Sequence, residues 1–216
     1  MSIKYQYIAI EGVIGVGKTT LATQLSEMLN ARLILEEFVS NTFLEKFYTN
    51  PERYAFPTEV GFLVERFQQF ESEFEQSLFS QSIVSDYFFD KSRIFARLNL
   101  NDPHFSLYKK LYSVLSKSIP TPDIILFLTA DIEHVKANIA KRGREMENDI
   151  DQNYLDSLSK SYFEYLKHMN KYPILVLDVT DFDFLNNEKF MKKIISLLST
   201  NWESGIHHIS IESDFK

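Results

Sequence analysis

The chain of 216 residues contains no cysteine, so it can form neither a disulfide nor a thiolate metal site. No apolar run approaches the roughly 20 residues that a membrane-spanning helix needs, and the opening MSIKYQYIAIEG has no signal-peptide pattern. The formal net charge is −7, which argues against a nucleic-acid backbone as the main partner. These absences predict a soluble, cytoplasmic protein that binds neither membrane nor nucleic acid.

Hydrophobic residues make up 44% of the chain, enough for a sizeable core, and predicted strands alternate with predicted helices. Strands are expected over residues 5–11, 31–37, 82–88, 122–130 and 173–179, and helices over 19–29, 42–48, 56–78, 90–98, 105–117, 132–142, 153–169 and 187–198. Strands that are almost wholly apolar are typical of a parallel sheet covered on both faces. The pattern predicts an α/β fold with a five-stranded parallel sheet in one domain, residues 1–200. The tail, residues 201–216, has no clear period, and we expect it to be partly disordered.

Glycine is scarce, yet three of the six glycines lie between positions 12 and 17. The stretch GVIGVGKT, residues 12–19, fits the pattern Gly-x-x-x-x-Gly-Lys-Ser/Thr and follows a predicted strand. Such a loop curls its N–H groups inward, and the next helix points its positive end at the same spot. We therefore expect a P-loop that binds nucleotide phosphates through Gly12, Gly15, Val16, Gly17, Lys18, Thr19 and Thr20. Lys18 would reach the β- and γ-phosphates and Thr19 would hold Mg²⁺; the alternative is a glycine-rich turn without a ligand.

A regulatory GTP-binding switch is disfavoured by two missing motifs. The guanine-reading pattern Asn-Lys-x-Asp is absent, since Asn170–Lys171 is followed by Tyr172 and Pro173. No Asp-x-x-Gly follows the third predicted strand either. The P-loop then points to an ATP-using enzyme or to a small-molecule kinase.

Carboxylates close two of the predicted strands. Glu36 and Glu37 end the second strand, and Asp86 ends the third. Ligands of open parallel sheets bind outside the carboxyl ends of the strands, where the P-loop also lies. A kinase needs a base near the acceptor hydroxyl and a carboxylate near Mg²⁺, so we expect Glu36, Asp86 and Lys18 to converge. Either carboxylate alone could be a helix cap or a solvated charge.

The long predicted helix carries Glu59 and Arg66 within an apolar stripe. Seven residues separate them, so they point about 20° apart on the helical wheel and lie about 10.5 Å apart along the axis. That distance is long for a direct ion pair, which leaves a bound ligand or a structural network as explanations. Farther on, Arg142 and Arg144 flank Gly143 in KRGRE. They form either a lid that closes over transferring phosphate or a solvated basic turn.

These motifs resemble the deoxyribonucleoside kinases of the deoxycytidine, deoxyguanosine and deoxyadenosine type, from about residue 6 to residue 198. The resemblance rests on IAIEGVIGVGKTT, LEEF, FYTNPERYAF and KRGREMEN. It implies a nucleoside-monophosphate-kinase-like P-loop fold with a short arginine-rich lid, ATP and Mg²⁺ as cofactors, and a homodimer. It also implies roles for individual residues: Glu36 as general base, Asp86 at Mg²⁺, Tyr48 and Glu147 at the sugar 3′-hydroxyl, Glu59 and Arg66 at the base, and Arg142 and Arg144 at the phosphates.

Three positions depart from that family's pattern. Tyr87 follows Asp86 where many members carry arginine, Ser92 stands where pyrimidine-preferring members carry aspartate, and Asn138 replaces a lid arginine. The stretch SDYFFDKSRIFA resembles the bacterial deoxyguanosine kinase version.

We therefore expect transfer of the ATP γ-phosphate to the 5′-hydroxyl of a purine deoxyribonucleoside in nucleotide salvage. An ionised Glu59 would accept both N1–H and the 2-amino group of guanine, which favours deoxyguanosine over deoxyadenosine. One alternative is a nucleoside monophosphate kinase such as a thymidylate kinase, although its acceptor site would need extra cations. A non-catalytic nucleotide-binding protein is the other.

Overall fold

The computed structural model describes residues 3–37, 41–75, 82–144, 150–180 and 187–210. Its centre is a six-stranded sheet in the order β2-β3-β1-β4-β5-β6, and every neighbouring pair is parallel. The strands are β1 (Tyr7–Gly12), β2 (Arg32–Ile34), β3 (Ile83–Ser85), β4 (Ile124–Thr129), β5 (Pro173–Asp178) and β6 (Gly205–Ile209). The expected parallel α/β fold is confirmed, with one strand more than the five predicted.

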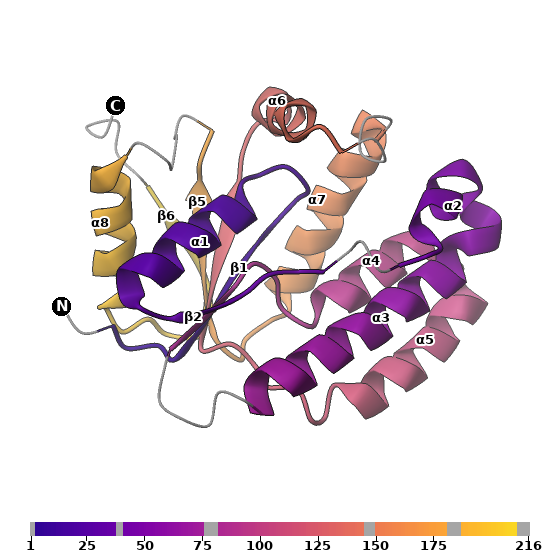
Figure 1. Ribbon diagram of the computed structural model, residues 1–216, viewed down its shortest axis with the longest axis horizontal. Helices are drawn as coiled ribbons and strands as arrows, with labels where there is room; N and C mark the ends of the chain where they lie inside the picture. Colours follow the sequence, from indigo (N-terminus) through magenta and orange to yellow (C-terminus); the bar gives the residue numbers. More distant parts are fainter. Residues whose placement is uncertain (1–2, 38–40, 76–81, 145–149, 181–186, 211–216) are drawn as a thin grey trace.

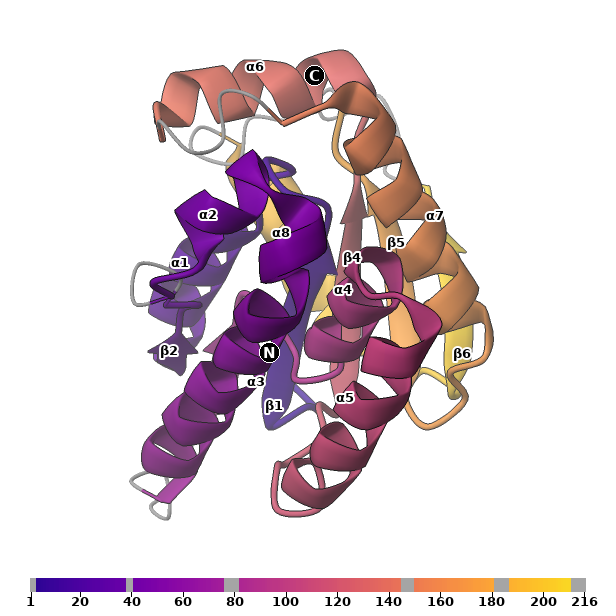
Figure 2. The ribbon, with the colours of Figure 1, turned by 90° about the vertical axis from the view of Figure 1, so that its right-hand side faces the viewer.

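Helices cover both faces of this sheet (Figures 1 and 2). They are α1 (Lys18–Leu29), α2 (Leu44–Thr49), α3 (Pro51–Glu75), α4 (Lys91–Asn99), α5 (Asp102–Leu115), α6 (Ile132–Arg142), α7 (Gln152–Lys167) and α8 (Glu188–Leu198). Helices α1 and α8 lie on one face, while α4 and α7 cover the other, with α3 and α5 packed outside α4. Helix α6 crosses above the carboxyl ends of the strands, so it covers the edge of the sheet at which the P-loop lies.

The additional strand comes from the segment expected to be a disordered tail. Residues Gly205–Ile209 pair in parallel with Pro173–Leu177 of β5. Trp202 anchors the approach to β6, because its backbone N–H donates to the Tyr5 hydroxyl at 3.0 Å and its indole Nε1 to Leu197 O at 2.9 Å. This strand, GIHHI, contains two histidines and a glycine among its five residues, so it lacks the alternation of apolar and polar residues that predicts a strand from sequence.

Strands β2 and β3 are shorter than predicted, for a reason that shapes the active site. Instead of continuing the ladder, the chain after Ile34 turns so that the Glu36 N–H donates to the Asp86 side chain at 2.8 Å. Both carboxylates therefore stand on backbone that has just left the sheet. Helix α3 in turn begins earlier than predicted, at Pro51, where a missing N–H costs nothing. Asn50 caps it by accepting from the Arg53 N–H.

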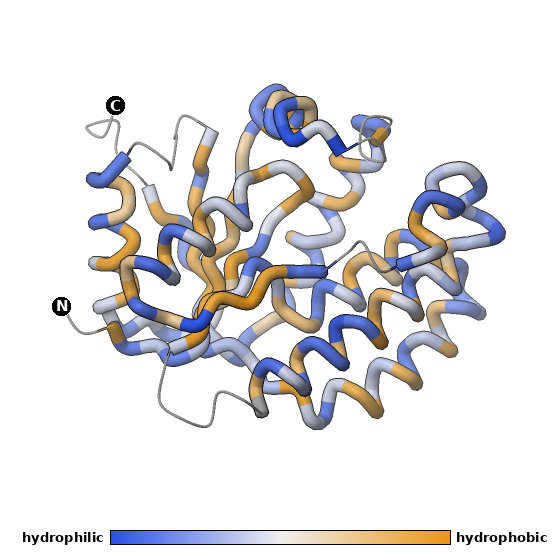
Figure 3. Tube along the Cα trace, viewed as in Figure 1, coloured by the Kyte–Doolittle hydropathy of each residue, from blue (hydrophilic) through white to orange (hydrophobic). Residues whose placement is uncertain are grey.

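The core lies between the strands and the inner faces of the helices (Figure 3). Strands β1 and β4 are buried along almost their whole length. Aromatic rings, Tyr7, Phe70, Tyr87 and Phe89, fill the space between the sheet and α3. Among the described ranges, every helix is too short or too polar to cross a bilayer.

Candidate active site

The P-loop forms as predicted between β1 and α1. Gly15, Gly17, Lys18, Thr19 and Thr20 line a cavity of about 790 Å³, whereas Gly12 and Val16 are buried in the loop itself. Gly15 has a φ of 82°, and a Cβ there would lie 2.8 Å from Val135 O of α6. Only glycine therefore lets α6 pack this closely against the loop.

The Lys18 side chain folds back over the loop. Its Nζ donates to Gly12 O and Val13 O, each at 2.9 Å. Burial and the nearby positive charge of Lys91 lower the pKa of Lys18 to about 8, against the opposing effect of Glu11, Glu36 and Asp86. Within the described part of the chain this ammonium donates to carbonyl oxygens and forms no ion pair, and a phosphate group would supply an anionic partner.

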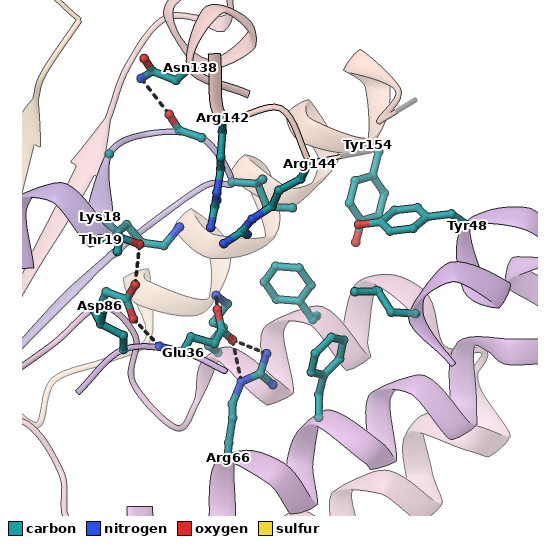
Figure 4. Close-up of a pocket in the computed structure, with 18 of the residues that line it drawn as sticks. Lys18, Thr19, Glu36, Tyr48, Arg66, Asp86, Asn138, Arg142, Arg144 and Tyr154 are labelled. Atoms are coloured by element: carbon teal, nitrogen blue, oxygen red, sulfur yellow. Dashed lines mark hydrogen bonds and ion pairs between the residues drawn. The ribbon is translucent and has the colours of Figure 1, made fainter. Parts of the chain in front are cut away.

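Asp86 joins the P-loop to the acceptor side. Its Oδ2 accepts from the Thr19 hydroxyl at 2.6 Å, and its Oδ1 accepts from the Glu36 N–H at 2.8 Å. The predicted convergence of Lys18, Glu36 and Asp86 at the carboxyl edge of the sheet is thus present in the structure (Figure 4). Glu37, the other candidate on this segment, is exposed and does not line the cavity.

Glu36 forms an ion pair with two cations. Arg66 donates to Oε1 through Nε at 2.9 Å and Nη2 at 2.7 Å, and Lys91 donates to Oε2 at 2.5 Å. Burial alone would raise the pKa of Glu36, but the positive charges of Lys91 and Arg66 outweigh it and hold that pKa well below its usual range. Glu36 is therefore a carboxylate at any physiological pH.

Glu59 does not pair with Arg66, whose remaining nitrogen, Nη1, donates to Ser92 Oγ at 2.8 Å. Its Oε1 accepts from Asn99 Nδ2 at 2.7 Å, and its buried Oε2 has no hydrogen-bond partner among the described residues. Burial raises the pKa of Glu59 to about 7, although the Asn99 bond and the charge of Arg66 oppose it. The helical-wheel argument placed Glu59 and Arg66 on the correct face but could not assign partners from other elements.

Opposite the P-loop, Arg142 and Arg144 point from the end of α6 into the cavity, and Tyr48 and Tyr154 face each other across its far side (Figure 4). Gly143 caps α6 with a φ of 65°, so the chain turns there and both arginines line the same space. Asn138, one turn earlier on α6, donates to Gly15 O at 2.9 Å and thus binds the P-loop. The predicted site residue Glu147 lies outside the described residues.

Sequence reasoning missed several polar residues that line this cavity, among them Lys91, Asn99 and Tyr154. Lys91 and Phe95 lie four residues apart on α4, and the ammonium of Lys91 sits 5.5 Å from that ring. A lysine on the inward face of an amphipathic helix was the available signal. Tyr87, which stands where many members of the family carry arginine, does not line the cavity. It is buried in the core, where its hydroxyl donates to Gln69 Oε1 at 2.5 Å.

A P-loop at the edge of a parallel sheet, an ionised carboxylate beside it and an arginine-bearing helix above it define a P-loop phosphotransferase. Residues 8–202 match the sequence profile of the deoxynucleoside kinases. The deoxyguanosine kinase of Bacillus subtilis is 35% identical over 193 residues, which are 87% of this chain and 93% of that protein. The deoxyadenosine/deoxycytidine kinase of the same organism is 31% identical over 205 residues, 91% of this chain and 93% of the relative.

A solved structure of a deoxynucleoside kinase has the same fold as this chain. The structure of deoxyadenosine kinase from M. mycoides with bound dCTP superimposes with a TM-score of 0.74 at 25% identity, covering 88% of this chain and 99% of that one. The chain belongs to the deoxynucleoside kinase family and is an ATP-dependent phosphotransferase.

Proposed function

We propose that this kinase transfers the γ-phosphate of ATP to the 5′-hydroxyl of a purine deoxyribonucleoside, in the cytoplasm and in nucleotide salvage. The observation that carries the proposal is the ionised Glu36 beside the P-loop, in a cavity whose far side is lined by aromatic residues and Glu59. On the acceptor side Arg66 and Lys91 are already paired with Glu36, and the far side of the cavity is aromatic, which suits a neutral nucleoside better than a nucleoside monophosphate.

In this mechanism each residue acts on a defined atom. Glu36 accepts the proton of the 5′-hydroxyl as its oxygen attacks the γ-phosphorus. Lys18 and the P-loop amides hold the β- and γ-phosphates, and Arg142 and Arg144 neutralise charge that grows on the transferring group. Tyr48 and Glu147 bind the sugar 3′-hydroxyl.

The Thr19 hydroxyl and the Asp86 carboxylate fit a Mg²⁺ ion. Their oxygens lie 2.6 Å apart at the mouth of the P-loop, and Mg²⁺ prefers one or two such hard oxygen ligands together with water and phosphate oxygens. When bound, the ion would neutralise charge on the phosphates.

Deoxyguanosine is the preferred purine in this proposal, and Glu59 reads its base. Ionised Glu59 accepts the two adjacent N–H donors of guanine, whereas N1 of adenine is an acceptor that would face the carboxylate. Ser92 is also unsuited to select cytosine, because its hydroxyl already accepts from Arg66. Relatives named for deoxyguanosine, deoxyadenosine and deoxycytidine leave the choice to experiment.

One assay tests the reaction: purified protein and labelled ATP with a panel of deoxynucleosides and deoxynucleoside monophosphates. Phosphorylation of purine deoxynucleosides but not of monophosphates is expected; the reverse result would assign the monophosphate kinase alternative. Glu59→Gln should lower the deoxyguanosine-to-deoxyadenosine ratio of kcat/KM at least tenfold, about 1.4 kcal/mol. An unchanged ratio would remove Glu59 from base reading.

The kinase domain is proposed to span residues 1–200, followed by a tail of residues 201–216 that contributes β6, and to form a homodimer. Leu107, Leu111 and Val114 form an exposed apolar stripe along α5, and Val64 is exposed on the adjacent helix α3. Exposed apolar residues gathered along one helix face fit an interface between subunits, and a two-fold dimer buries the same surface on both subunits. Leu111→Arg should shift sedimentation toward monomer, while an unchanged dimer would place the interface elsewhere.

A further inference from the structure

Lys91 is a buried cation at the start of α4. Only 5% of it is exposed, and it lines the cavity. Lysines are almost never this buried without a partner. Its ammonium group has three N–H donors, and within the described part of the chain it donates to Glu36 Oε2 at 2.5 Å.

Glu36 does not need Lys91 to be held in place. Arg66 already binds Oε1 through two N–H groups and is fixed by a third bond to Ser92. One carboxylate with two cations leaves a net positive charge at a site largely screened from water. Buried charge is costly unless it is compensated, so this arrangement is suited to receive an anion.

That positive charge lies between the proposed base and the P-loop. Lys91 lowers the pKa of Lys18 and opposes the burial that raises the pKa of Glu11, so it interacts with groups at both ends of the loop. Tyr87 cannot act at this point, because its hydroxyl is directed into the core toward Gln69. In the segment that follows β3, Lys91 is therefore the cation placed at the junction between donor and acceptor.

We propose that Lys91 is a catalytic residue: its ammonium donates to Glu36 Oε2 in the free enzyme and contacts the 5′-oxygen and the transferring phosphoryl group during the reaction. The inference rests on the proposed function. The 5′-hydroxyl meets the Oε2 side of Glu36, where the flexible lysine yields more readily than the Arg66 fork. The bond from O5′ to the γ-phosphorus forms, the bond from that phosphorus to the β–γ bridging oxygen breaks, and the hydroxyl proton passes to Glu36. Lys91 stays protonated and neutralises the phosphoryl oxygens.

A split between kcat and KM separates this role from mere packing. Arg66 still binds Glu36 when Lys91 is removed, so the carboxylate keeps its place and nucleoside binding should change little. The cation that meets the transferring phosphoryl group is lost, so kcat should fall.

The experiment compares wild type, Lys91→Met, Lys91→Arg and the core control Tyr87→Phe, with ATP and deoxyguanosine or deoxyadenosine at pH 7. Lys91→Met should lower kcat by about 10²–10³-fold with a smaller change in nucleoside KM. Lys91→Arg should recover most of kcat, and Tyr87→Phe should keep the wild-type kcat and KM. Unfolding midpoints of all four proteins report whether each is folded.

Two results would overturn the role of Lys91: a folded Lys91→Met enzyme with near wild-type kcat, or a folded Lys91→Arg enzyme as impaired as Lys91→Met. A loss in Lys91→Met that lies mainly in nucleoside KM, with kcat unchanged, would do the same. Wild-type protein that phosphorylates no deoxynucleoside would instead refute the proposed function, and with it the reaction assigned to Lys91.

Discussion

Glu59→Gln should change how the stability of this protein depends on pH. Glu59 is buried, one of its oxygens accepts only from Asn99, and the other has no partner among the described residues. Burial raises its pKa to about 7 from an ordinary value of 4.5. Each pH unit of separation carries about 1.4 kcal/mol, so ionised Glu59 lowers the free energy of unfolding by about 3 kcal/mol.

The sign follows from which state holds the proton. Below pH 4.5, Glu59 is protonated in the folded and the unfolded chain, and its ionisation has no effect on stability. As the pH rises from 4.5 to 7, the unfolded chain releases the proton first, so stability falls. Above pH 7 the folded chain also ionises, and the loss stays constant. Glutamine does not titrate. Its NH2 group, left without an acceptor, lowers the free energy of unfolding by the same amount at every pH.

Urea unfolding at pH 5, 6, 7 and 8 measures the effect as the wild-type minus variant difference in the free energy of unfolding. That difference should fall by about 2–3 kcal/mol from pH 5 to pH 8. Glu71→Gln, at an exposed position of the same helix, is the control and should run parallel to wild type. Parallel curves for Glu59→Gln as well would refute the reasoning, because they would mean that Glu59 ionises alike in both states.

Four further substitutions test the proposed roles. Glu36→Gln keeps size but removes proton acceptance, so kcat should fall about 10²–10⁴-fold with little change in nucleoside KM; near-normal turnover would exclude Glu36 as the base. Arg142→Ala and Arg144→Ala should reduce kcat more than nucleoside binding, because the charge they meet grows in the transition state; weaker nucleoside binding at constant kcat would contradict this. Asn138→Ala removes the bond to Gly15 O and should raise the KM for ATP about fivefold, roughly one hydrogen bond, whereas a selective rise in nucleoside KM would contradict its place at the P-loop.

Motifs that act through the local backbone were predictable from the sequence. The P-loop needs only a strand, glycines, a lysine and a helix in order, and all lie within residues 7–29. Asp131 as the cap of α6 is equally local, since its side chain accepts from the His134 N–H at 2.7 Å. Glu36 and Asp86 could be brought together because parallel strands end at one edge of the sheet.

Partners supplied by another element were not predictable. The helical wheel of α3 gives a direction for Arg66, but its partners Glu36 and Ser92 lie after β2 and on α4. The same limit hid Asn99, which reaches Glu59 across forty positions of sequence. Strand β6 was missed for a different reason, because it pairs along only one edge and its residues are mostly half-buried, so its alternation is weak.

The position of Arg66 sets the protonation of two carboxylates at once. Its fork is committed to Glu36, which Lys91 and Arg66 together keep ionised, and among the described residues Glu59 accepts from a single amide donor. Were Arg66 turned toward Glu59, Glu36 would lose one of its two cations and Glu59 would become a permanent anion. Environments that push the pKa values of two carboxyl groups apart are how one site assigns them different tasks. Here the ionised group, Glu36, lies beside the P-loop and is the proton acceptor of the proposed reaction, and Glu59, with a pKa of about 7, is the proposed reader of the base. Binding of guanine, which offers two donors, should therefore release a proton from Glu59, whereas binding of adenine, which offers one donor beside an acceptor, should retain it.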